Sequence, residues 1–535
     1  MEKRITKIKE TTNTISGAYF LVELLRESGV DTIFGYPGSP ILPLYEELAK
    51  TDIKHILSRH ELGAVHSAEG YAKIKNKPGV VLVTSGPGFS NTLTGIMNAY
   101  ADSTPLVVIA GQVENHGVNE FQDVDIASVA KTFTKRIYQI NKTSEIESSI
   151  KKAFIMANKV PKAPVIVTLK KSVLTSAVTE KSPYRIKKDI RVEAPHSCVL
   201  KAIETLKNAK TPLIIAGGGC KNYEKDLIEF AQLSHIPIVT TLMGTGIASN
   251  LSIGMIGING NEHLNKSIEN ADVVLSLGVR FTNRTTMNKN VFLPNSKIIN
   301  INIKQNKSDN VSIHQEIIGD LDVILQQFIG TIKAKNILFD IKYNWVENLI
   351  STDKKEVINS DKFSQENILK EIYEYTKKFN PIITTDIGEH QIGVATTFKT
   401  NFASNFIISG GFGSMGFGLP AGIGAYIAKP NSLVMNITGD GSFQMNMQEL
   451  GTVAEYNIPL KIFIMNNSSL GMIKTQQKKS QYKTYQSDLI NPDFAKIAQS
   501  YGILGYTITN MKDLRTALKE IFTYKKAVIL DIKMS

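Results

Sequence analysis

The chain has 535 residues, 42% hydrophobic and 21% charged, and this ordinary balance excludes collagen-like, disordered and membrane-embedded classes. Its net charge of +12 is spread over scattered lysine doublets, so we expect a solvated surface and no nucleic-acid partner. The apolar runs are shorter than the ~20 residues of a membrane-spanning helix. The charged N-terminus lacks an apolar signal segment and the two cysteines cannot form a disulfide framework, so we expect a cytoplasmic protein.

The order of β-rich and helical patterns predicts an α/β fold with three doubly wound parallel-sheet domains in series. Each third of the chain restarts the alternation of strand and helix. We place the domains at 1–185, 190–335 and 360–535. The lysine-rich stretch near Lys181–Arg191 and the stretch Gly330–Ser364, which holds the only tryptophan, are expected to be linkers.

Apolar, β-branched runs bounded by turn residues mark the expected strands, and amphipathic stretches between them mark the helices. In chain order, strands are expected at Ile53–Ser58, Gly79–Thr84, Pro105–Ala110, Thr211–Ala216, Ile236–Thr240, Ala271–Leu277, Lys297–Ile303, Ser432–Thr438 and Leu460–Met465. Helices are expected at Glu61–Lys75, Asn91–Asp102, Asn222–Ser234 and Phe443–Tyr456.

The most informative stretch places two oxygen-bearing side chains at the ends of successive strands in the last third. One β-rich run ends at Gly439-Asp440-Gly441, and after a helix the next ends at Asn466-Asn467. Both ends are expected at the carboxyl edge of a parallel sheet, where open α/β sheets bind ligands. The glycines permit close approach of a phosphate, and the helix N-terminus behind them favours anions. Mg²⁺ fits Asp440 and Asn467, because it usually completes its octahedron with phosphate oxygens and water.

This arrangement resembles the magnesium–diphosphate motif of thiamine diphosphate enzymes, which runs from GDG to NN. The resemblance covers nearly the whole chain and is strongest for the acetolactate synthases. The matching segments are FGYPGSPILPLYEEL, RHELGAVHSAEGYA, KPGVVLVTSGPGFSNTLTGIMNAYADSTPLVVIAGQV, FQDVDI, TTLMGTGI, GFGSMGFGLPAGIGA and NPDFAKIAQSYG. It implies a pyrimidine-binding domain, a central Rossmann-like domain and a domain that binds diphosphate and Mg²⁺.

By this resemblance, the cofactors are thiamine diphosphate and Mg²⁺, and the metal ligands are Asp440, the Asn467 side chain and the Ser469 carbonyl. Glu61 is the catalytic glutamate that shares a proton with the aminopyrimidine of the cofactor, although a glutamate opening a helix is more often a surface residue. Further cofactor contacts are implied at Tyr36, Pro37, Gly86, Gly88, Asn91, Gln112, Ile387, Gly388, His390, Met415, Gly439, Gly441, Ser442, Leu470, Gly471 and Met472.

The resemblance also implies the reaction, the formation of a carbon–carbon bond by a transferase of the acetolactate synthase type. Pyruvate is decarboxylated on the cofactor and the acetyl unit is added to a second 2-oxo acid. Phe121, Gln122, Lys171 and Arg284 match the pyruvate-handling residues. In this family the active site lies at a dimer interface, so a homodimer or homotetramer is expected; a regulatory subunit stays open.

Several residues depart from the family pattern on the acceptor side. Gln476 stands in place of a tryptophan, Glu389 in place of a glutamine near the diphosphate, Gly393 in place of a bulky residue, and Leu62 in place of a glutamine. These changes leave open another carbonyl acceptor, such as a keto-sugar or an aldehyde. A simple 2-oxo acid decarboxylase is a further alternative, which the presence of Phe121, Lys171 and Arg284 opposes.

The middle third resembles the FAD-contacting segments of acetolactate synthases, so FAD is a possible cofactor. A cofactor-free spacer is the alternative, because no GxGxxG motif is present and Thr282, Asn259 and Asn302 depart from the family pattern. The residues that would contact FAD are Gly217, Gly218, Gly219, Thr241, Leu242, Arg280, Arg284 and Asp320.

Overall fold

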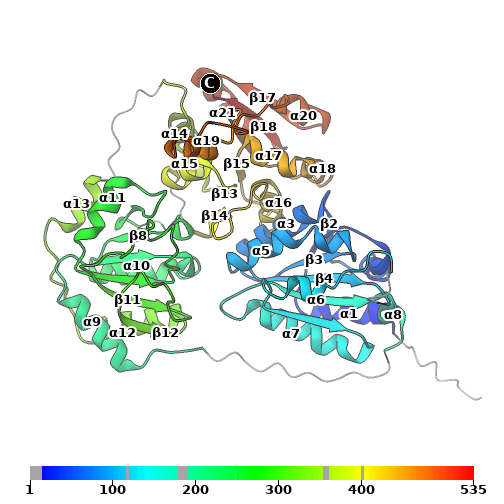
Figure 1. The fold of residues 1–535 in the computed structure, drawn as a ribbon, viewed down its shortest axis with the longest axis horizontal. Coiled ribbons are helices and arrows are strands. Elements are labelled where there is room, and N and C mark those ends of the chain that lie inside the picture. The colour runs from blue at the N-terminus through cyan, green and yellow to red at the C-terminus, as the bar shows by residue number, and fades with distance from the viewer. Residues whose placement is uncertain are drawn as a thin grey trace, which may run out of the picture. The chain divides into compact units, whose positions relative to one another are not determined.

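The computed structural model describes residues 15–115, 120–178, 191–247, 249–352, 361–398 and 403–534. Within them the chain forms three six-stranded sheets, and every strand pairing in these sheets is parallel. Helices flank both faces of each sheet (Figure 1). The predicted α/β class with three parallel-sheet domains in series is confirmed. The chain divides into two compact units: the first 187 residues without 69–76, and the remainder.

The first sheet belongs to the first unit and has the strand order β2-β1-β3-β4-β6-β5. Its strands are β1 (Thr32–Gly35), β2 (Lys54–Leu57), β3 (Gly79–Val83), β4 (Leu106–Gln112), β5 (Arg136–Ile140) and β6 (Val165–Lys170). The associated helices are α1 (Gly17–Glu27), α2 (Leu42–Leu48), α3 (Glu61–Lys75), α4 (Pro87–Ser90), α5 (Leu93–Ala101), α6 (Ile126–Ala130), α7 (Ile146–Asn158) and α8 (Lys171–Thr175). β3 and β4 are buried along their whole length, which is why they read as continuous apolar runs.

The second sheet has the order β12-β11-β10-β7-β8-β9, the arrangement of a dinucleotide-binding fold. Its strands are β7 (Leu213–Ala216), β8 (Ile238–Thr240), β9 (Ser252–Met255), β10 (Val273–Leu277), β11 (Lys297–Asn302) and β12 (Ile313–Ile318). Its helices are α9 (His196–Lys207), α10 (Glu224–Ser234), α11 (Glu262–Ser267), α12 (Leu321–Ala334) and α13 (Trp345–Thr352).

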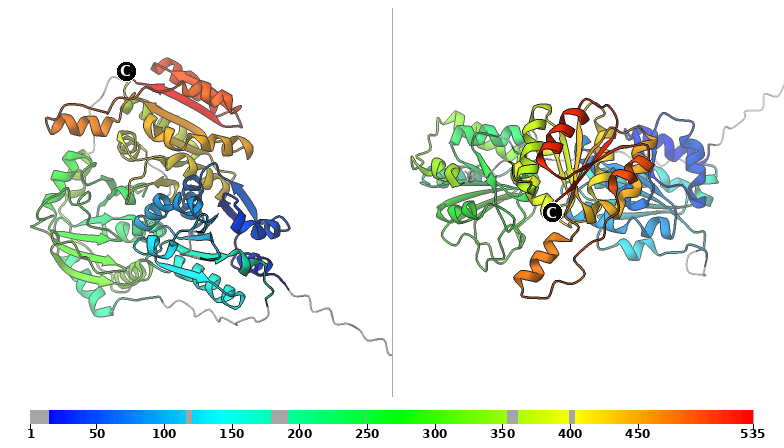
Figure 2. Two further views of the ribbon diagram at one scale, coloured as in Figure 1. Left: turned by 45° about the vertical axis from the view of Figure 1, so that its right-hand side comes forward. Right: turned by 90° about the horizontal axis from the view of Figure 1, so that it is seen from above.

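The third sheet, order β14-β13-β15-β16-β18-β17, repeats the topology of the first. Its strands are β13 (Ile382–Thr385), β14 (Phe406–Ile408), β15 (Val434–Gly439), β16 (Lys461–Asn466), β17 (Leu504–Ile508) and β18 (Val528–Lys533). Its helices are α14 (Gln365–Thr376), α15 (Glu389–Thr397), α16 (Gly418–Ala428), α17 (Asp440–Asn446), α18 (Leu450–Glu455), α19 (Gly471–Lys479), α20 (Phe494–Ser500) and α21 (Met511–Ile521). α19 stands away from this sheet (Figure 2) and none of its residues is buried.

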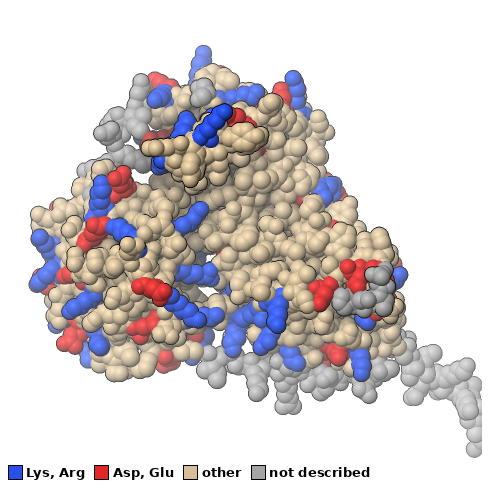
Figure 3. All heavy atoms as spheres, in the orientation of Figure 1, with Lys and Arg blue, Asp and Glu red and all other residues tan. Residues whose placement is uncertain are grey.

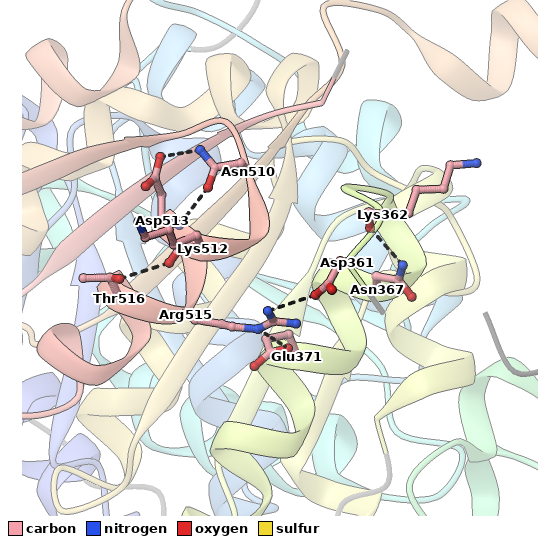
Figure 4. Close-up of polar contacts among 9 residues, drawn as sticks. All are labelled: Asp361, Lys362, Asn367, Glu371, Asn510, Lys512, Asp513, Arg515 and Thr516. Carbon is pink, nitrogen blue, oxygen red and sulfur yellow. Dashed lines mark hydrogen bonds and ion pairs between the residues drawn. The ribbon is translucent and has the colours of Figure 1, made fainter. Parts of the chain in front are cut away.

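One helix of the third sheet shows how the sequence sets an element. α21 begins at the cap Asn510, whose side chain accepts a hydrogen bond from the Asp513 backbone N–H (Figure 4). Its buried residues recur at helical spacing and face the sheet. On its outer side, Arg515 pairs with Glu371 of α14 and with Asp361, each at 3.1 Å (Figure 4). These exposed pairs add little stability, so the apolar face holds α21 in place.

Two expectations from the sequence are wrong. The helix expected at Phe443–Tyr456 begins three residues earlier, at Asp440, and is divided into α17 and α18 by a 3₁₀ turn at Met447–Glu449. The Asn446 amide donates to the Gly416 carbonyl at 2.6 Å, and at Asn446 the backbone leaves the helical region.

The second error concerns Gly330–Ser364, which was expected to be a linker. α12 continues to Ala334, and α13 starts at Trp345, which is 5% exposed and packs among apolar residues of the second sheet. The Trp345 indole N–H donates to the Pro212 carbonyl at 2.7 Å. Residues 353–360 of that stretch, and most of the linker expected near Lys181–Arg191, lie outside the described residues.

The surface agrees with scattered charge. On the face drawn in Figure 3, lysine and arginine form several small groups with acidic residues among them. No helix among the described residues combines the length and apolarity needed to cross a membrane.

Candidate active site

Asp440 lies at the carboxyl edge of the third sheet, as its position after a β-rich run predicts. β15 and β16 are parallel neighbours with Gly439 opposite Met465, so the first residue of α17 and the residues that follow β16 share one edge. The Asp440 carboxylate is only 2% exposed and accepts a hydrogen bond from Asn491 Nδ2 at 2.6 Å. Burial raises the pKa of Asp440, although this bond and the backbone N–H groups of Gly441 and Ser469 oppose the rise.

Asn467 and Ser469 follow β16 in a tight turn. Ser468 has a φ of +50°, and the Ser469 N–H donates to Asn467 Oδ1 at 3.1 Å. Leu470 N–H donates to the Ser487 carbonyl and Leu489 N–H to the Ser468 carbonyl, both at 2.8 Å, so the turn is held against a second backbone segment. In the described part of the chain, no cluster of three or more His, Cys, Asp or Glu side chains could hold a metal. A cation at Asp440 therefore needs amide, carbonyl, phosphate or water oxygens as its remaining ligands.

A hydrogen-bonded network behind Asp440 was missed by the sequence reasoning. Asn491 Nδ2 also donates to Asn466 Oδ1 at 2.8 Å, and Asn491 Oδ1 accepts from Gln444 Nε2 at 2.9 Å. Asn466 Nδ2 donates in turn to Asp531 Oδ1 at 2.8 Å. Asp531 is fully buried, and burial raises its pKa. Asn491 lies in the NPDF segment. It is 51 residues from Asp440 and 25 from Asn466, so no sequence pattern indicates that these side chains meet.

The neighbouring strand β13 contributes the segment Ile387 to His390. β13 and β15 are adjacent although one strand separates them in sequence, so this is the point where the strand order reverses, the usual ligand site of such sheets. His390 is 5% exposed, and burial lowers its pKa to about 4, so the ring is neutral near pH 7. Its Nε2 is buried without a hydrogen-bond partner among the described residues.

Glycines surround the His390 ring. A Cβ on Gly439 would lie 3.0 Å from His390 Nδ1, and a Cβ on Gly388 would lie 2.7 Å from His390 Cε1. Gly388 also has a φ of +147°, which side chains rarely adopt. Gly388 therefore requires glycine while the imidazole occupies this place, and a side chain at Gly439 would press against the ring.

The other expected diphosphate-side residues gather around the same edge. A Cβ on Gly441 would lie 3.0 Å from Leu470 Cδ2 and 3.5 Å from Met415 Cε, so these three residues are neighbours. Ser442 Oγ donates to the Ile387 carbonyl at 3.4 Å. Gly471 and Met472 open α19, and Gln476 is exposed further along that helix.

Glu389, one of the departures from the family pattern, opens α15 and is half-buried. Its Oε1 accepts a hydrogen bond from Thr475 Oγ1 at 3.2 Å. A Cβ on Gly471 would lie 2.3 Å from Glu389 Oε2 and 2.9 Å from Asn467 Nδ2. The carboxylate thus faces the start of α19, close to an expected metal ligand. Another departure, Gly393, leaves space that Leu369 fills, since a Cβ there would lie 2.5 Å from Leu369 Cδ1.

In the first unit, Glu61 opens α3 and is half-buried. Its Oε2 accepts a hydrogen bond from Asn91 Nδ2 at 2.9 Å. A Cβ on Gly88 would lie 3.6 Å from Glu61 Oε1 and 2.5 Å from Thr84 Cγ2. The structure therefore brings Glu61, Asn91 and the glycine turn after β3 together.

The remaining expected residues of this unit lie around the same edge or at the surface. Gly86, with a φ of +57°, packs against Gln122, because a Cβ there would lie 2.7 Å from Gln122 Cβ. Phe121 is 84% exposed. The others, Tyr36 and Pro37 after β1, Gln112 at the end of β4 and Lys171 at the start of α8, follow the carboxyl ends of parallel strands.

The residues expected to contact FAD lie partly at the point where the strand order of the second sheet reverses, between β7 and β10. The glycine turn after β7 packs against the turn after β10, since a Cβ on Gly217 would lie 2.3 Å from the Gly278 carbonyl oxygen and a Cβ on Gly219 2.8 Å from Gly278 Cα. A Cβ on Gly218 would lie 3.0 Å from Met243 Cβ. Packing within the chain thus requires glycine at Gly217 and Gly219 and leaves little room for a side chain at Gly218.

The other members of that set are dispersed. Asp320 Oδ2 accepts a hydrogen bond from the Val192 N–H at 2.8 Å, and Leu242 packs against the core of the third sheet. Thr241 is buried, and its N–H donates to the Ala216 carbonyl at 3.0 Å. Arg280 and Arg284 are exposed.

Comparison with known proteins agrees with this architecture. Three family models match the chain: the N-terminal TPP binding domain of thiamine pyrophosphate enzymes over 15–129, the central domain over 199–328 and the C-terminal TPP binding domain over 386–532. The acetolactate synthase large subunit of Haemophilus influenzae is 36% identical, with 97% of this chain and 94% of the relative covered. The acetolactate synthase large subunit of Lactococcus lactis is 37% identical, with 97% and 92% covered. The chain therefore belongs to the thiamine pyrophosphate enzymes and, among them, to the acetolactate synthase large subunits.

Proposed function

We propose that this chain is a thiamine diphosphate- and Mg²⁺-dependent carboligase that decarboxylates pyruvate and transfers the acetyl unit to a second 2-oxo acid. With pyruvate as both donor and acceptor, two molecules of pyruvate give one acetolactate and one CO₂. The observation that carries the proposal is the edge of the third sheet. There a buried carboxylate, an amide side chain and a buried histidine nitrogen with no partner among the described residues lie around glycine turns.

The residues at this edge fit the diphosphate and its metal. Asp440, the Asn467 side chain and the Ser469 carbonyl would hold Mg²⁺, because all three offer the hard oxygen atoms that this cation prefers. A divalent cation would also offset the burial that raises the pKa of Asp440. The buried His390 Nε2 has no partner among the described residues, and a phosphate oxygen would give it one.

Glu61 is the proposed catalytic residue of the first unit. Thiamine diphosphate supplies the carbanion chemistry when it is bound. Asn91 donates a hydrogen bond to Glu61 Oε2. Glu61 Oε1 is therefore the oxygen proposed to hold or release the proton that is exchanged with the aminopyrimidine. Phe121, Gln122 and Lys171 of this unit, with Arg284 of the other, are proposed to handle pyruvate, and the arginine can bind a carboxylate through two parallel hydrogen bonds.

We propose in addition that two copies of the chain form the active enzyme, each contributing to both sites. This rests on the family resemblance and on the placement of the two sets of expected residues in separate compact units. The names of the relatives, large subunits, suggest a second kind of subunit as a partner. Sedimentation of the purified chain with and without cofactor tests the homo-oligomer.

Turnover tests the function. Purified protein with thiamine diphosphate, Mg²⁺ and pyruvate should release CO₂ and form acetolactate, identified by its mass. Glu61→Gln should lower the rate about 100-fold or more while keeping the volume of the side chain, since general acid–base groups contribute ~10²–10⁴-fold. Acetaldehyde alone would indicate a decarboxylase or another acceptor, and no consumption of pyruvate would contradict the donor assignment. Competition between pyruvate and 2-oxobutyrate tests the effect of Gln476 on the acceptor.

A flavin has weaker support. The glycine triplet is accounted for by packing against Gly278 and Met243, and Asp320 by its bond to Val192. These contacts need no flavin, so no step of the reaction is derived through one. The visible absorption spectrum of the purified protein tests for bound FAD.

A further inference from the structure

Glu389 places a negative charge where a diphosphate, itself an anion, is proposed to bind. The resemblance makes glutamine the usual residue at this position, so the charge is a property of this chain. The carboxylate is half-buried at the start of α15, on the same edge as Asp440. A Cβ built on Gly471 would lie 2.3 Å from Glu389 Oε2 and 2.9 Å from Asn467 Nδ2, so both side chains approach the start of α19.

Nothing among the described residues neutralises this charge. Glu389 forms no ion pair within the described part of the chain, and its one side-chain hydrogen bond comes from Thr475. Lys474, the lysine next to Thr475, instead pairs with Asp488 at 2.5 Å. The second acid at this edge, Asp440, accepts from Asn491 and backbone N–H groups, which carry no charge either.

The direction of the carboxylate decides which ligand it favours. It faces Gly471 and Asn467, so it lies next to an expected metal ligand and cannot turn away from the site without leaving Thr475. A fixed negative charge attracts a divalent cation and repels a diphosphate, and neither effect is fully screened at a half-buried position.

We propose that, because of Glu389, this protein depends more strictly on Mg²⁺ for binding thiamine diphosphate than a protein with glutamine at this position would. The inference rests on the proposed function, because it uses the same metal and diphosphate site. Glu389 strengthens binding of the cation and weakens binding of the cofactor when no cation is present. Its proposed role is to set the order in which the site fills.

Glu389→Gln tests the proposal, because glutamine keeps the shape and can still accept a hydrogen bond from Thr475. Calorimetric titration measures thiamine diphosphate binding to cofactor-free protein, first with EDTA and then at increasing Mg²⁺ concentrations. We expect E389Q to bind the cofactor on the order of tenfold more tightly in EDTA, the effect of one charge several ångströms away. We also expect E389Q to need more Mg²⁺, by a similar factor, for half-maximal cofactor binding at a fixed concentration.

In E389Q the affinity for the cofactor in EDTA should rise while the affinity for Mg²⁺ falls. These opposite changes distinguish an effect of the charge from an effect of altered structure. Loss of local structure would weaken both the cofactor in EDTA and the cation. Thr475→Val is the matched control: it removes the hydrogen bond to Glu389 but keeps the carboxylate, so both quantities should change less than in E389Q. Urea unfolding followed by Trp345 fluorescence checks that both variants fold.

The outcomes distinguish this inference from the function on which it rests. If both proteins bind the cofactor at saturating Mg²⁺ with the same Mg²⁺ dependence, the role of Glu389 is refuted and the proposed function stands. If E389Q weakens both ligands, Glu389 is a structural anchor of α19 and the inference is again refuted. If the unaltered protein binds no thiamine diphosphate at any Mg²⁺ concentration, both proposals fail.

Discussion

Replacing Asn491 with alanine should weaken the proposed metal site although Asn491 is not itself a proposed metal ligand. The Asn491 side chain donates to Asp440 Oδ2 and Asn466 Oδ1 and accepts from Gln444 Nε2. The hydrogen bond from Asn491 Nδ2 holds Asp440 Oδ2 in place, and it thereby also orients Asp440 Oδ1. Alanine would remove that bond and leave the backbone N–H groups of Gly441 and Ser469 to hold the carboxylate.

The size of the effect follows from the three hydrogen bonds. A bond to a charged group contributes ~1.5–3 kcal/mol and a neutral bond about 1 kcal/mol. Asn491 is half-buried, so water can replace part of the loss, and we expect a decrease of about 3 kcal/mol in the unfolding free energy. Because loss of a residue that orients a metal ligand typically lowers affinity ~10–100-fold, the Mg²⁺ concentration for half-maximal cofactor binding should rise by a similar factor.

The assay combines urea unfolding of the cofactor-free protein with thiamine diphosphate titrations at several Mg²⁺ concentrations. Asn510→Ala is the matched control, because it removes the cap of α21 in the same domain (Figure 4) and leaves the hydrogen bonds of Asn491 in place. It should lower stability by about 1 kcal/mol and leave the Mg²⁺ dependence unchanged. If N491A loses stability but keeps the Mg²⁺ dependence of the unaltered protein, Asn491 does not position Asp440 and the reasoning is refuted.

Two further substitutions test buried titratable groups. Lys461 is 3% exposed with Nζ bonded to the Tyr524 and Lys526 carbonyls, and burial lowers its pKa from 10.5 to about 8. The unfolded chain therefore binds more protons between those values, so the unfolding free energy should rise with pH from about 8 to 10.5, by up to about 3 kcal/mol. Lys461→Met should remove this rise in urea titrations across the interval, and an unchanged pH profile would contradict the assignment. His390→Phe removes Nε2, which has no partner among the described residues, but also the hydrogen bond between the ring and the Asp386 backbone. These two losses act on stability in opposite directions, so the unfolding temperature of the cofactor-free protein should change little while thiamine diphosphate binds about tenfold more weakly; equal affinity would show that His390 contacts no phosphate.

Nine of the eighteen strands that the structure describes could be predicted, most of them because they are buried on both faces. β3, β4 and β16 read as continuous apolar runs, and turn residues mark their ends within a few positions. The helix after β15 was predicted less well, since glycine and aspartate in its first turn hide its start. The break near Asn446 depends on the Gly416 carbonyl, and the burial of Trp345 depends on the Pro212 carbonyl. Neither partner is near in sequence.

The candidate site shows the same division. Asp440 and Asn467 could be placed together from the sequence, because both follow β-rich runs one repeat apart. Asn491 and Asp531 could not, because only the folded sheet brings them to Asn466. The resemblance identified Glu389 as unusual, but only the structure shows that its carboxylate faces Gly471 and Thr475.

The polar network behind β15 and β16 is better explained by a ligand than by stability. Two carboxylates, Asp440 and Asp531, are buried close to amide side chains, and burial raises the pKa of each. A raised folded-state pKa means that each carboxylate adds stability only at acidic pH, and that this contribution is lost as the pH rises through the folded value. At neutral pH both groups therefore oppose folding in the absence of a cation. A ligand that binds only the folded state stabilises it, by about 2.7 kcal/mol at one hundred times its Kd, and so opposes this cost. The amide of Asn491 donates to Asp440 and orients the carboxylate but leaves its charge uncompensated, which is the arrangement that the proposed metal site requires.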